Sequence, residues 1–560
     1  MNYPRQCHRS GRPHGALLTA GAASLMLPLA ACTVGPNFVR PTTPTPAHWA
    51  LPTPSSLPAA PGAAGSAGAT GSAAPSESAA EVAAGAGVSL PPLSTISEGP
   101  AALAAWWTQF HDPVLSSLIE RSVSANLDLR AAVLRIQEAR TQRDISAAGG
   151  LPTVSANASY DRERISESTP EGALIGSAGK FSIPGFGSLR IPNPYNQYQL
   201  GAAASWEPDL FGRLRRSIEA ANAQLQVSVE DQHALQVSLL SRVAQSYIAL
   251  RSAQAREAIA SANLATIDDL LDLTRQRRAA GLTTELDVRN ALAQLAQTRA
   301  SLPAFDLQIS QSIHALGNLL GLAPEALRAQ LASAAPIPPV PPQVPIGLPA
   351  QLARRRPDVR QAEASLHAAT AQIGVAVGDL FPRLTLSASG GVQSEAANTL
   401  LHWSSLFGSV GPGLQLPVFD RGAWKTVHLD NLRAQEAALS YQATVLNALH
   451  EVQDAVAAYA ADQQQRQWLT DAVAQNRLAL SIAQQRYQSG VTDFLDVLDA
   501  QRSLQQNQLA LLSVTAAVST DLVTLYRTLG GGWSAAAAAA PAPAQTAANA
   551  PVAPASAAIP

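Results

Sequence analysis

Two aspartates, Asp496 and Asp499, lie three residues apart after a glycine turn in the stretch RYQSGVTDFLDVLDAQ (486–501). On a helix, residues at i and i+3 share one face, so both carboxylates would point the same way. An ordinary solvated helix surface shows the same spacing. If copies of the chain met around one axis, however, the carboxylates would form a cation-attracting constriction. Their mutual repulsion would raise some of their pKa values.

This glycine turn has a weaker echo in RRAAGLTTELDVRNAL (277–292). Glycine supplies the left-handed conformation that ends a helix, and Thr283 and Thr492 are of a type that caps the helix that follows. The sequence therefore predicts two helix reversals. Their tips comprise Arg277, Gly281, Leu282, Thr283, Arg486, Gly490, Val491 and Thr492.

The first 31 residues have the pattern of a secretion signal, with three arginines ahead of the apolar run 15–31. The run ends in LAAC, which resembles a bacterial lipobox, where cleavage frees a cysteine that receives lipid. We therefore expect a covalent lipid on Cys32; ordinary cleavage beside a bystander cysteine is the alternative. Thr33 follows, in place of the aspartate that resembles an inner-membrane retention signal, and this favours the outer membrane.

Residues with the spacing of a catalytic or metal site are not found. GSAGKF (176–181) lacks the P-loop spacing, and the ten histidines include no HExxH motif. Cys7 leaves with the signal, so the mature chain has one cysteine and can form neither an internal disulfide nor a cysteine metal cluster. We expect no enzyme activity, no metal and no cofactor apart from the lipid on Cys32.

The composition narrows the class of protein. Of the 560 residues 47% are hydrophobic, and the net charge is −2, which excludes a disordered polyanion and a basic nucleic-acid binder. Abundant alanine with few aromatic residues favours long, closely packed helices. No run of 18 or more apolar residues occurs beyond the N-terminus, so a membrane crossing would have to use strands.

The chain contains an internal repeat. LDLRAAVLRIQEAR (127–140) matches PDVRQAEASLHAAT (357–370), and the two glycine turns align at an offset of 209 residues. The first half carries a longer loop at 167–194. The expected parts are a signal peptide (1–31), a lipidated N-terminus with a flexible Pro/Ala/Gly/Ser linker (32–98), a first repeat (99–334), a Pro-rich strap (335–349), a second repeat (350–532) and a disordered Ala/Pro tail (533–560).

Each repeat has the pattern helix, strand, loop, strand, very long helix, turn, helix. Apolar and polar residues alternate at 154–160, 198–206, 384–389 and 414–418, as a strand between lipid and water requires. The long helices are predicted at 209–280 and 420–489, and the shorter ones at 113–148, 283–320, 350–379 and 491–529. Heptad-like seams include Leu240, Val243, Tyr247 and Leu250, and Val445, Leu449, Val452, Val456 and Tyr459.

Four strands cannot close a barrel, and open sheet edges are not tolerated in hydrocarbon, so several chains would have to share one barrel. Together with VGPNFVRP (34–41), WWTQFHDPVLSSLI (106–119), WEPDLFGRLRR (206–216) and the turn at 486–501, the lipobox resembles the TolC-type outer-membrane efflux proteins, in their OprM/NodT-like lipoprotein branch. The resemblance implies an α+β membrane channel-tunnel: a homotrimer with a shared 12-stranded β-barrel and a periplasmic α-barrel.

The resemblance also implies roles for particular residues. Asp496 and Asp499 match the periplasmic gate, and Tyr487 and Asp287 match a hydrogen-bonded pair that holds it closed. Thr492 stands where some relatives have an arginine of a second link. The tips of the two turns are implied to dock a periplasmic adaptor.

The function implied is that of an exit duct in a tripartite efflux pump, passively carrying small molecules such as drugs. The partners would be the adaptor, an inner-membrane pump of the RND type and outer-membrane lipid, and the substrate would be chosen by the pump. Two alternatives remain: a structural periplasmic lipoprotein without a pore, and an exit duct of a protein secretion system.

Overall fold

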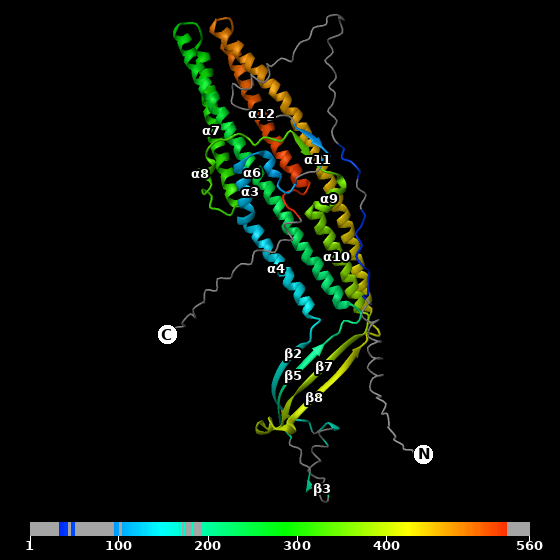
Figure 1. Cartoon of the computed structure of the whole chain (residues 1–560). Coiled ribbons are helices and arrows are strands. Elements are labelled where there is room, and N and C mark those ends of the chain that lie inside the picture. The colour runs from blue at the N-terminus through cyan, green and yellow to red at the C-terminus, as the bar shows by residue number, and fades with distance from the viewer. Residues whose placement is uncertain are drawn as a thin grey trace, which may run out of the picture. The chain divides into compact units, whose positions relative to one another are not determined.

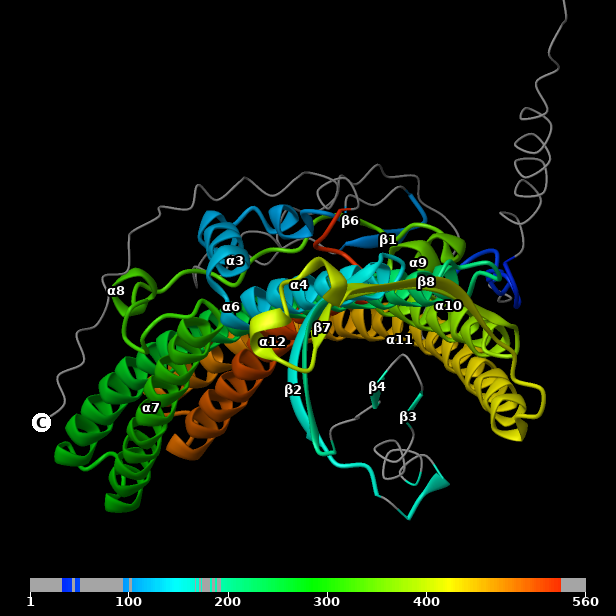
Figure 2. The same ribbon diagram turned by 90° about the horizontal axis from the view of Figure 1, so that it is seen from below.

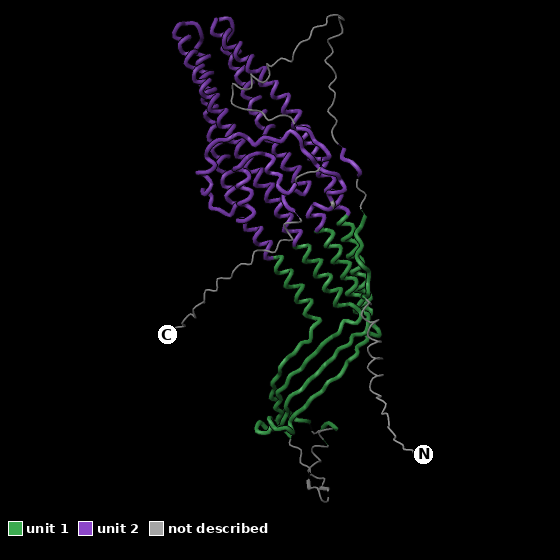
Figure 3. Tube along the Cα trace, viewed as in Figure 1, with its two compact units in different colours: residues 1–42, 135–228, 361–441 green, residues 43–134, 229–360, 442–560 purple. Residues whose placement is uncertain are grey.

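The computed structural model describes residues 33–42, 46–50, 94–99, 103–166, 168–170, 173, 182–183, 187–188 and 193–534. The predicted signal, Cys32, most of the predicted linker and the tail from 535 onward lie outside these residues. The chain divides into two units, one of residues 1–42, 135–228 and 361–441, the other of residues 43–134, 229–360 and 442–560 (Figure 3). Both repeats contribute to each unit.

The first unit holds a four-stranded antiparallel sheet in the order β2-β5-β7-β8 (Figure 1). Its strands are β2 (Thr153–Glu163), β5 (Tyr195–Trp206), β7 (Arg383–Ser394) and β8 (Leu406–Gln415). Each repeat supplies one hairpin, and β5 pairs with β7 to join them. The four predicted strands are thus confirmed, except that Leu416 and Val418 lie beyond β8. The register would pair Leu416 with Pro382, which precedes β7 and has no N–H for a ladder bond.

Short elements lie in the connections of the two hairpins. The long loop predicted in the first repeat contains β3 (Ser182–Ile183) and β4 (Gly187–Ser188), which pair with each other. The β7–β8 connection contains two 3-10 turns, η4 (Ala397–Thr399) and η5 (Trp403–Ser405).

The predicted long helices are α6 (Arg213–Ala279) and α11 (Arg421–Gln488), of 67 and 68 residues. The returning helices are α7 (Glu285–Leu319) and α12 (Phe494–Thr528). These boundaries agree with the predicted ones to within a few residues. Figure 2 shows the α6–α7 and α11–α12 tips side by side, as does Figure 1.

The helix predicted before the first strand of each repeat is two helices. They are α3 (Pro113–Ala125) and α4 (Leu127–Ala148), and α9 (Pro349–Arg355) and α10 (Pro357–Gly378). Asn126 interrupts the first pair with an extended backbone while its Oδ1 accepts a hydrogen bond from the Leu129 N–H, 2.9 Å away. Arg356 interrupts the second because a residue before proline avoids the helical conformation. The prediction of a single helix before the first strand of each repeat was therefore wrong.

The helices of the second unit pack through the predicted seams. Leu240, Val243, Tyr247 and Leu250 of α6 are fully buried. On α11, Val445, Val452, Val456 and Tyr459 are buried, and Leu449 is half-buried. Two further short helices, η3 (Trp106–Phe110) and α8 (Arg328–Leu331), complete the described helices.

Helix α12 is long and apolar enough to cross a membrane by length and composition. Polar residues such as Asp499, Arg502 and Asp521 interrupt its apolar runs, so it contains no continuous run of 18 apolar residues. Val518, Leu522 and Leu525 of this helix are fully buried within the chain, so we assign α12 to the helical core.

The predicted linker is anchored at both of its described ends. Trp49 is buried; its backbone N–H donates to Glu98 Oε1 at 2.8 Å, and its indole Nε1 donates to the Gly347 carbonyl at 2.9 Å. Strand β1 (Thr95–Ser97) runs parallel to β6 (Gln343–Pro345) of the predicted strap. The two ends of the linker therefore meet on the strap.

Candidate functional site

The sheet has one apolar and one polar face. Directly paired residues point to the same side of a sheet, and one row across all four strands reads Val154, Ala204, Ala388 and Val410. The next row, on the opposite face, reads Ser155, Ala203, Ser389 and Ser409. This alternation continues along the strands and confirms the predicted pattern, which suits a wall between hydrocarbon and water.

The polar face is hollowed and hydrogen-bonded. A cavity there, of about 220 Å³, is lined by Thr153, Ser155, Ala203, Ala204, Ser205, Ser387, Ala388, Ser389 and Ser409. The hydroxyls of Ser389 and Ser409 lie 2.8 Å apart across β7 and β8. Within the described part of the chain, β2 and β8 each have only one strand partner, so the sheet has two open edges.

The first helical tip turns at Gly281, whose φ is +74°. The Leu282 N–H donates to the Arg277 carbonyl at 2.9 Å, which closes the end of α6. Helix α7 then begins at a capping box formed by Thr284 and Asp287. The predicted cap at Thr283 was wrong by one residue, because Thr283 instead donates through Oγ1 to Asp287 Oδ2, at 2.6 Å.

The carboxylate of Asp287 accepts hydrogen bonds from its neighbours at the start of α7. Both Thr283 and Thr284 donate hydroxyl hydrogen bonds to it, and so does the Thr284 N–H at 3.0 Å. Burial raises the pKa of this carboxyl, but these hydrogen bonds outweigh burial and hold the pKa below its ordinary value. Asp287 therefore stays charged at the start of α7, where the helix dipole also favours a negative charge.

The second tip turns at Gly490, whose φ is +75°, and the Val491 N–H donates to the Arg486 carbonyl at 2.9 Å. Helix α12 begins without a side-chain cap, since Asp493 at the N-cap makes no such bond. Thr492 does not cap the helix as predicted but donates its hydroxyl to Asp496.

The predicted gate residues Asp496 and Asp499 are both exposed, one turn apart on α12. The residues between and beside them, Phe494, Val497 and Leu498, are buried in the core of the tip. The shared face predicted from the i, i+3 spacing is thus present.

Tyr487 and Asp287 do not form the predicted hydrogen bond. Tyr487 is 2% exposed, and its hydroxyl has no hydrogen-bond partner in the described part of the chain. Its ring is covered instead by the guanidinium of Arg277, with Cζ 4.6 Å from the ring centroid. Arg277 Nη1 also donates to the Gln488 carbonyl at 3.0 Å, so this predicted tip residue joins the two tips.

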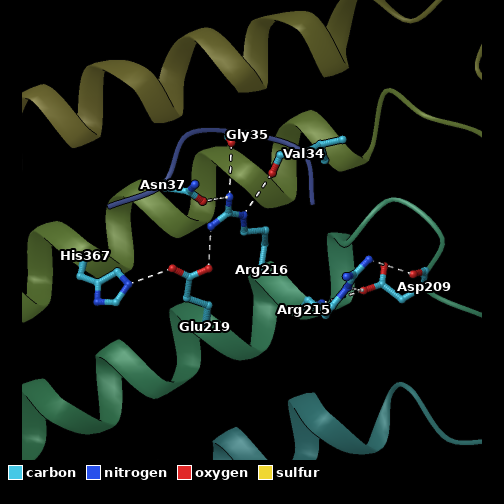
Figure 4. Close-up of polar contacts among 8 residues, drawn as sticks. All are labelled: Val34, Gly35, Asn37, Asp209, Arg215, Arg216, Glu219 and His367. Atoms are coloured by element: carbon cyan, nitrogen blue, oxygen red, sulfur yellow. Dashed lines mark hydrogen bonds and ion pairs between the residues drawn. The ribbon is translucent and has the colours of Figure 1, made fainter. Parts of the chain in front are cut away.

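The segment directly after Cys32 is bound at the start of α6 (Figure 4). The buried guanidinium of Arg216 donates to the carbonyls of Val34 and Gly35, at 3.1 and 3.3 Å, and to Asn37 Oδ1 at 2.7 Å. The Val34 N–H donates to the carbonyl of Phe211, at 3.1 Å. The buried side chain of Arg216 therefore binds segment 33–37 through three hydrogen bonds.

Further contacts extend this binding along the segment. Arg216 also donates to Glu219 at 2.7 Å, Glu219 lies 2.9 Å from the His367 ring nitrogen, and Phe38 stacks on His367. Arg40 then pairs with Glu363. Burial raises the pKa of Glu219, but its contacts with His367 and Arg216 outweigh burial and lower it overall.

Two glycines make the close approach of this segment possible. A side chain at Gly374 of α10 would collide with Arg216, and one at Gly212 would meet Thr33 at 3.0 Å. Sequence reasoning noted VGPNFVRP only as a motif and missed its binding site. The site brings Arg216 against Gly374, far away in the chain, and no local pattern reveals such a contact.

Comparison with known proteins decides the family. The sequence profile of the family described as outer membrane efflux protein matches residues 118–322 and 348–531. The chain belongs to this family. It is 33% identical over 428 residues to the solvent efflux pump outer membrane protein SrpC of Pseudomonas putida, covering 76% of this chain and 87% of that protein.

Two further comparisons agree. Nodulation protein T of Rhizobium leguminosarum bv. viciae is 32% identical over 455 residues, covering 81% of this chain and 89% of that protein. The solved outer-membrane channel OprN is 34% identical with a TM-score of 0.72, covering 90% of this chain and all of the OprN chain.

The predicted resemblance, outer-membrane location and function are therefore confirmed. This efflux protein is an outer-membrane exit duct of an efflux pump. Its family consists of channel proteins and not of known enzymes, and its fold is that of the outer-membrane channels.

Proposed function

We propose that three copies of this efflux protein close one 12-stranded barrel in the outer membrane, with a helical tunnel in the periplasm. The observation that carries the proposal is the four-stranded sheet, with one apolar face, one serine-rich face and two open edges. Open edges are not stable in hydrocarbon, so β8 of one copy would pair with β2 of the next. Eight strands would be filled by side chains, whereas twelve leave a channel.

A lipid on Cys32 would anchor each copy. Thr33, the residue directly after it, lies against Gly212, six residues after the end of β5. Segment 33–37 is held there by Arg216. The acyl chains would thus leave the protein where the sheet ends, at the surface of the bilayer.

Asp496 and Asp499 would form the gate. In a trimer, the two exposed carboxylates of each copy would converge on the threefold axis as six charges, and a ring of aspartates constricts the passage and attracts cations. The tips, Arg277 to Thr283 and Arg486 to Thr492, would dock a periplasmic adaptor that connects the duct to an inner-membrane pump of the RND type.

The cargo would be small molecules, drugs among them, carried passively. The relative SrpC is named for a solvent efflux pump, and small apolar solutes are therefore the first class to test. No cofactor is needed for such transport, because the inner-membrane partner supplies the energy.

Single-channel conductance of the purified protein in planar bilayers tests this function. The parent should conduct weakly, and the variant Asp496→Ala/Asp499→Ala should conduct much more. Asp268→Ala/Asp269→Ala is the matched control, because these two exposed aspartates of α6 carry the same charge away from the tips. No conductance from any inserted variant would overturn the duct and leave a structural lipoprotein.

A further inference from the structure

Arg277 reaches from one helical tip to the other, at the end of the apolar core that the two hairpins share. Arg277 belongs to α6, in the first repeat, and its contacts are Tyr487 and Gln488 at the end of α11, in the second. Its Nη2 is also the nearest atom to the position that a side chain at Gly490 would occupy, at 3.8 Å. Arg277 therefore lies against the turn of the opposite tip.

The repeat shows that this contact is particular to Arg277. Its counterpart at the offset of 209 residues is Arg486, which begins the same R-x-x-x-G turn. Arg486 is exposed, whereas Arg277 is half-buried. The difference arises because the counterpart of Tyr487 is Arg278, so an aromatic ring is available only to Arg277.

Tyr487 is held by its ring and not by its hydroxyl. Phe494 packs edge-on against it, with ring centroids 5.8 Å apart, and Arg277 covers the ring face. The buried hydroxyl has no partner in the described part of the chain, nor has Nε of Arg277. Because buried polar atoms without partners are unfavourable, this arrangement of the tips is one that a better-bonded state can replace.

Asp287 does not bond to Tyr487. The hydrogen bonds that Thr283 and Thr284 donate to Asp287 all end on Oδ2, and the Tyr487 hydroxyl has no partner in the described part of the chain. Beside Tyr487, the polar contact from the first tip is the bond that Arg277 donates to the Gln488 carbonyl.

We propose that Arg277 is the positioning residue that keeps the two tips of each chain together, through the ring of Tyr487 and the carbonyl of Gln488. An adaptor that offers Arg277 a carboxylate or a carbonyl would withdraw it from Tyr487 and release the α11–α12 tip, which carries Asp496 and Asp499. Docking and opening would thus share one side chain. This inference rests on the proposed duct and names the residue that regulates it.

Conductance without any adaptor tests the inference. Arg277→Ala should raise the open probability roughly 2- to 30-fold, the range that loss of a cation–π contact alone gives. Tyr487→Leu should act likewise, whereas Tyr487→Phe, which keeps the ring, should match the parent. Arg275→Ala is the matched control, because Arg275 is an exposed arginine of the same helix that pairs with Asp272, and it should also match the parent. An Arg277→Ala variant that conducts like Arg275→Ala would overturn the inference.

A distance measurement separates this inference from the duct itself. Spin labels at Leu282→Cys and Val491→Cys, on the exposed tips, should give a narrow distance distribution in the parent background and a broader one with Arg277→Ala. Label added to protein without the two cysteines gives the background. Unchanged distances with Arg277→Ala would refute the proposed role of Arg277, whether or not the protein conducts. Broadened distances without conductance would refute only the duct.

Discussion

Asp287 and Asp496 are counterparts in the internal repeat, 209 residues apart, and each accepts a hydrogen bond from a threonine four residues earlier. Asp287 also receives the capping bond of Thr284, whereas Asp496 follows a tip without a side-chain cap. The repeated turn is therefore followed by a helix with a capping box in the first repeat and by a helix without a side-chain cap in the second. The helix without the cap, α12, carries the predicted gate residues.

This asymmetry predicts a difference in local stability between the tips. Thr284→Ala should destabilise the start of α7 by about 0.5–2 kcal/mol, as loss of an N-cap does, and amide hydrogen exchange of residues 285–288 would measure it. Asp493→Ala is the matched change at the other tip, where it removes no capping bond. Equal effects at the two tips would contradict the proposed asymmetry.

Acid should loosen the first tip. The folded-state pKa of Asp287 is depressed below its ordinary value of 3.8, so its contribution to stability is present above pH 3.8 and is lost as the pH falls through the lower folded pKa. Hydrogen exchange of the same amides between pH 5 and pH 3, corrected for intrinsic rates, should show falling protection. Asp287→Asn should flatten that dependence.

The bound N-terminal segment predicts a specific role for Arg216. Arg216→Ala removes three donors from segment 33–37, and loss of charged hydrogen bonds worth about 1.5–3 kcal/mol should speed exchange of the Val34 amide roughly 10- to 100-fold. The neighbouring Arg215→Ala is the control, because Arg215 contacts Asp209 instead. Exchange that is equally fast in both variants would indicate a general loss of folding.

The central strand pair depends on a glycine. A side chain at Gly391 would collide with the backbone of Leu200 and Gly201 on β5, whereas one at Gly390 would meet its nearest atom at 3.6 Å. Gly391→Ala should therefore weaken the β5–β7 pairing that joins the two repeats, and Gly390→Ala should be tolerated. Resistance of the assembled protein to dissociation in SDS would compare them; equal resistance would show that the strands adjust.

Local sequence patterns predicted the helices and strands well, but they did not predict contacts between residues far apart in the chain. Alternation gave the strands and their two faces, and heptad spacing gave seam residues such as Tyr247 and Tyr459, because each signal is written in neighbouring residues. The breaks at Asn126 and Arg356 were missed, since a helical pattern continues through them. The family-based Tyr487–Asp287 bond was not found: Asp287 bonds to Thr283 and Thr284 beside it, and the ring of Tyr487 lies against Arg277.

The linker shows the same limit from another side. Its composition predicted a flexible tether, but composition carries no information on where a chain returns. Trp49 and Glu98 are 49 residues apart and are joined by a hydrogen bond of 2.8 Å. Trp49 also donates to the carbonyl of Gly347 in the strap, 298 residues further on.

A half-buried acidic pair among the helices predicts an unusual response to pH. Burial, together with the neighbouring carboxylate of Asp462, raises the pKa of Asp521 to about 7. The folded state therefore holds an extra proton between pH 4 and 7, so stability should fall as the pH rises through that window. Asp521→Asn should remove the fall and stabilise the protein at pH 8 by roughly 1–3 kcal/mol, allowing for solvent screening of a half-buried pair.

Apparent melting temperatures at pH 5 and pH 8 would measure this change in stability. Asp306→Asn is the control, because Asp306 is an exposed aspartate of α7. A parent that melts higher at pH 8 than its Asp521→Asn variant would refute the raised pKa.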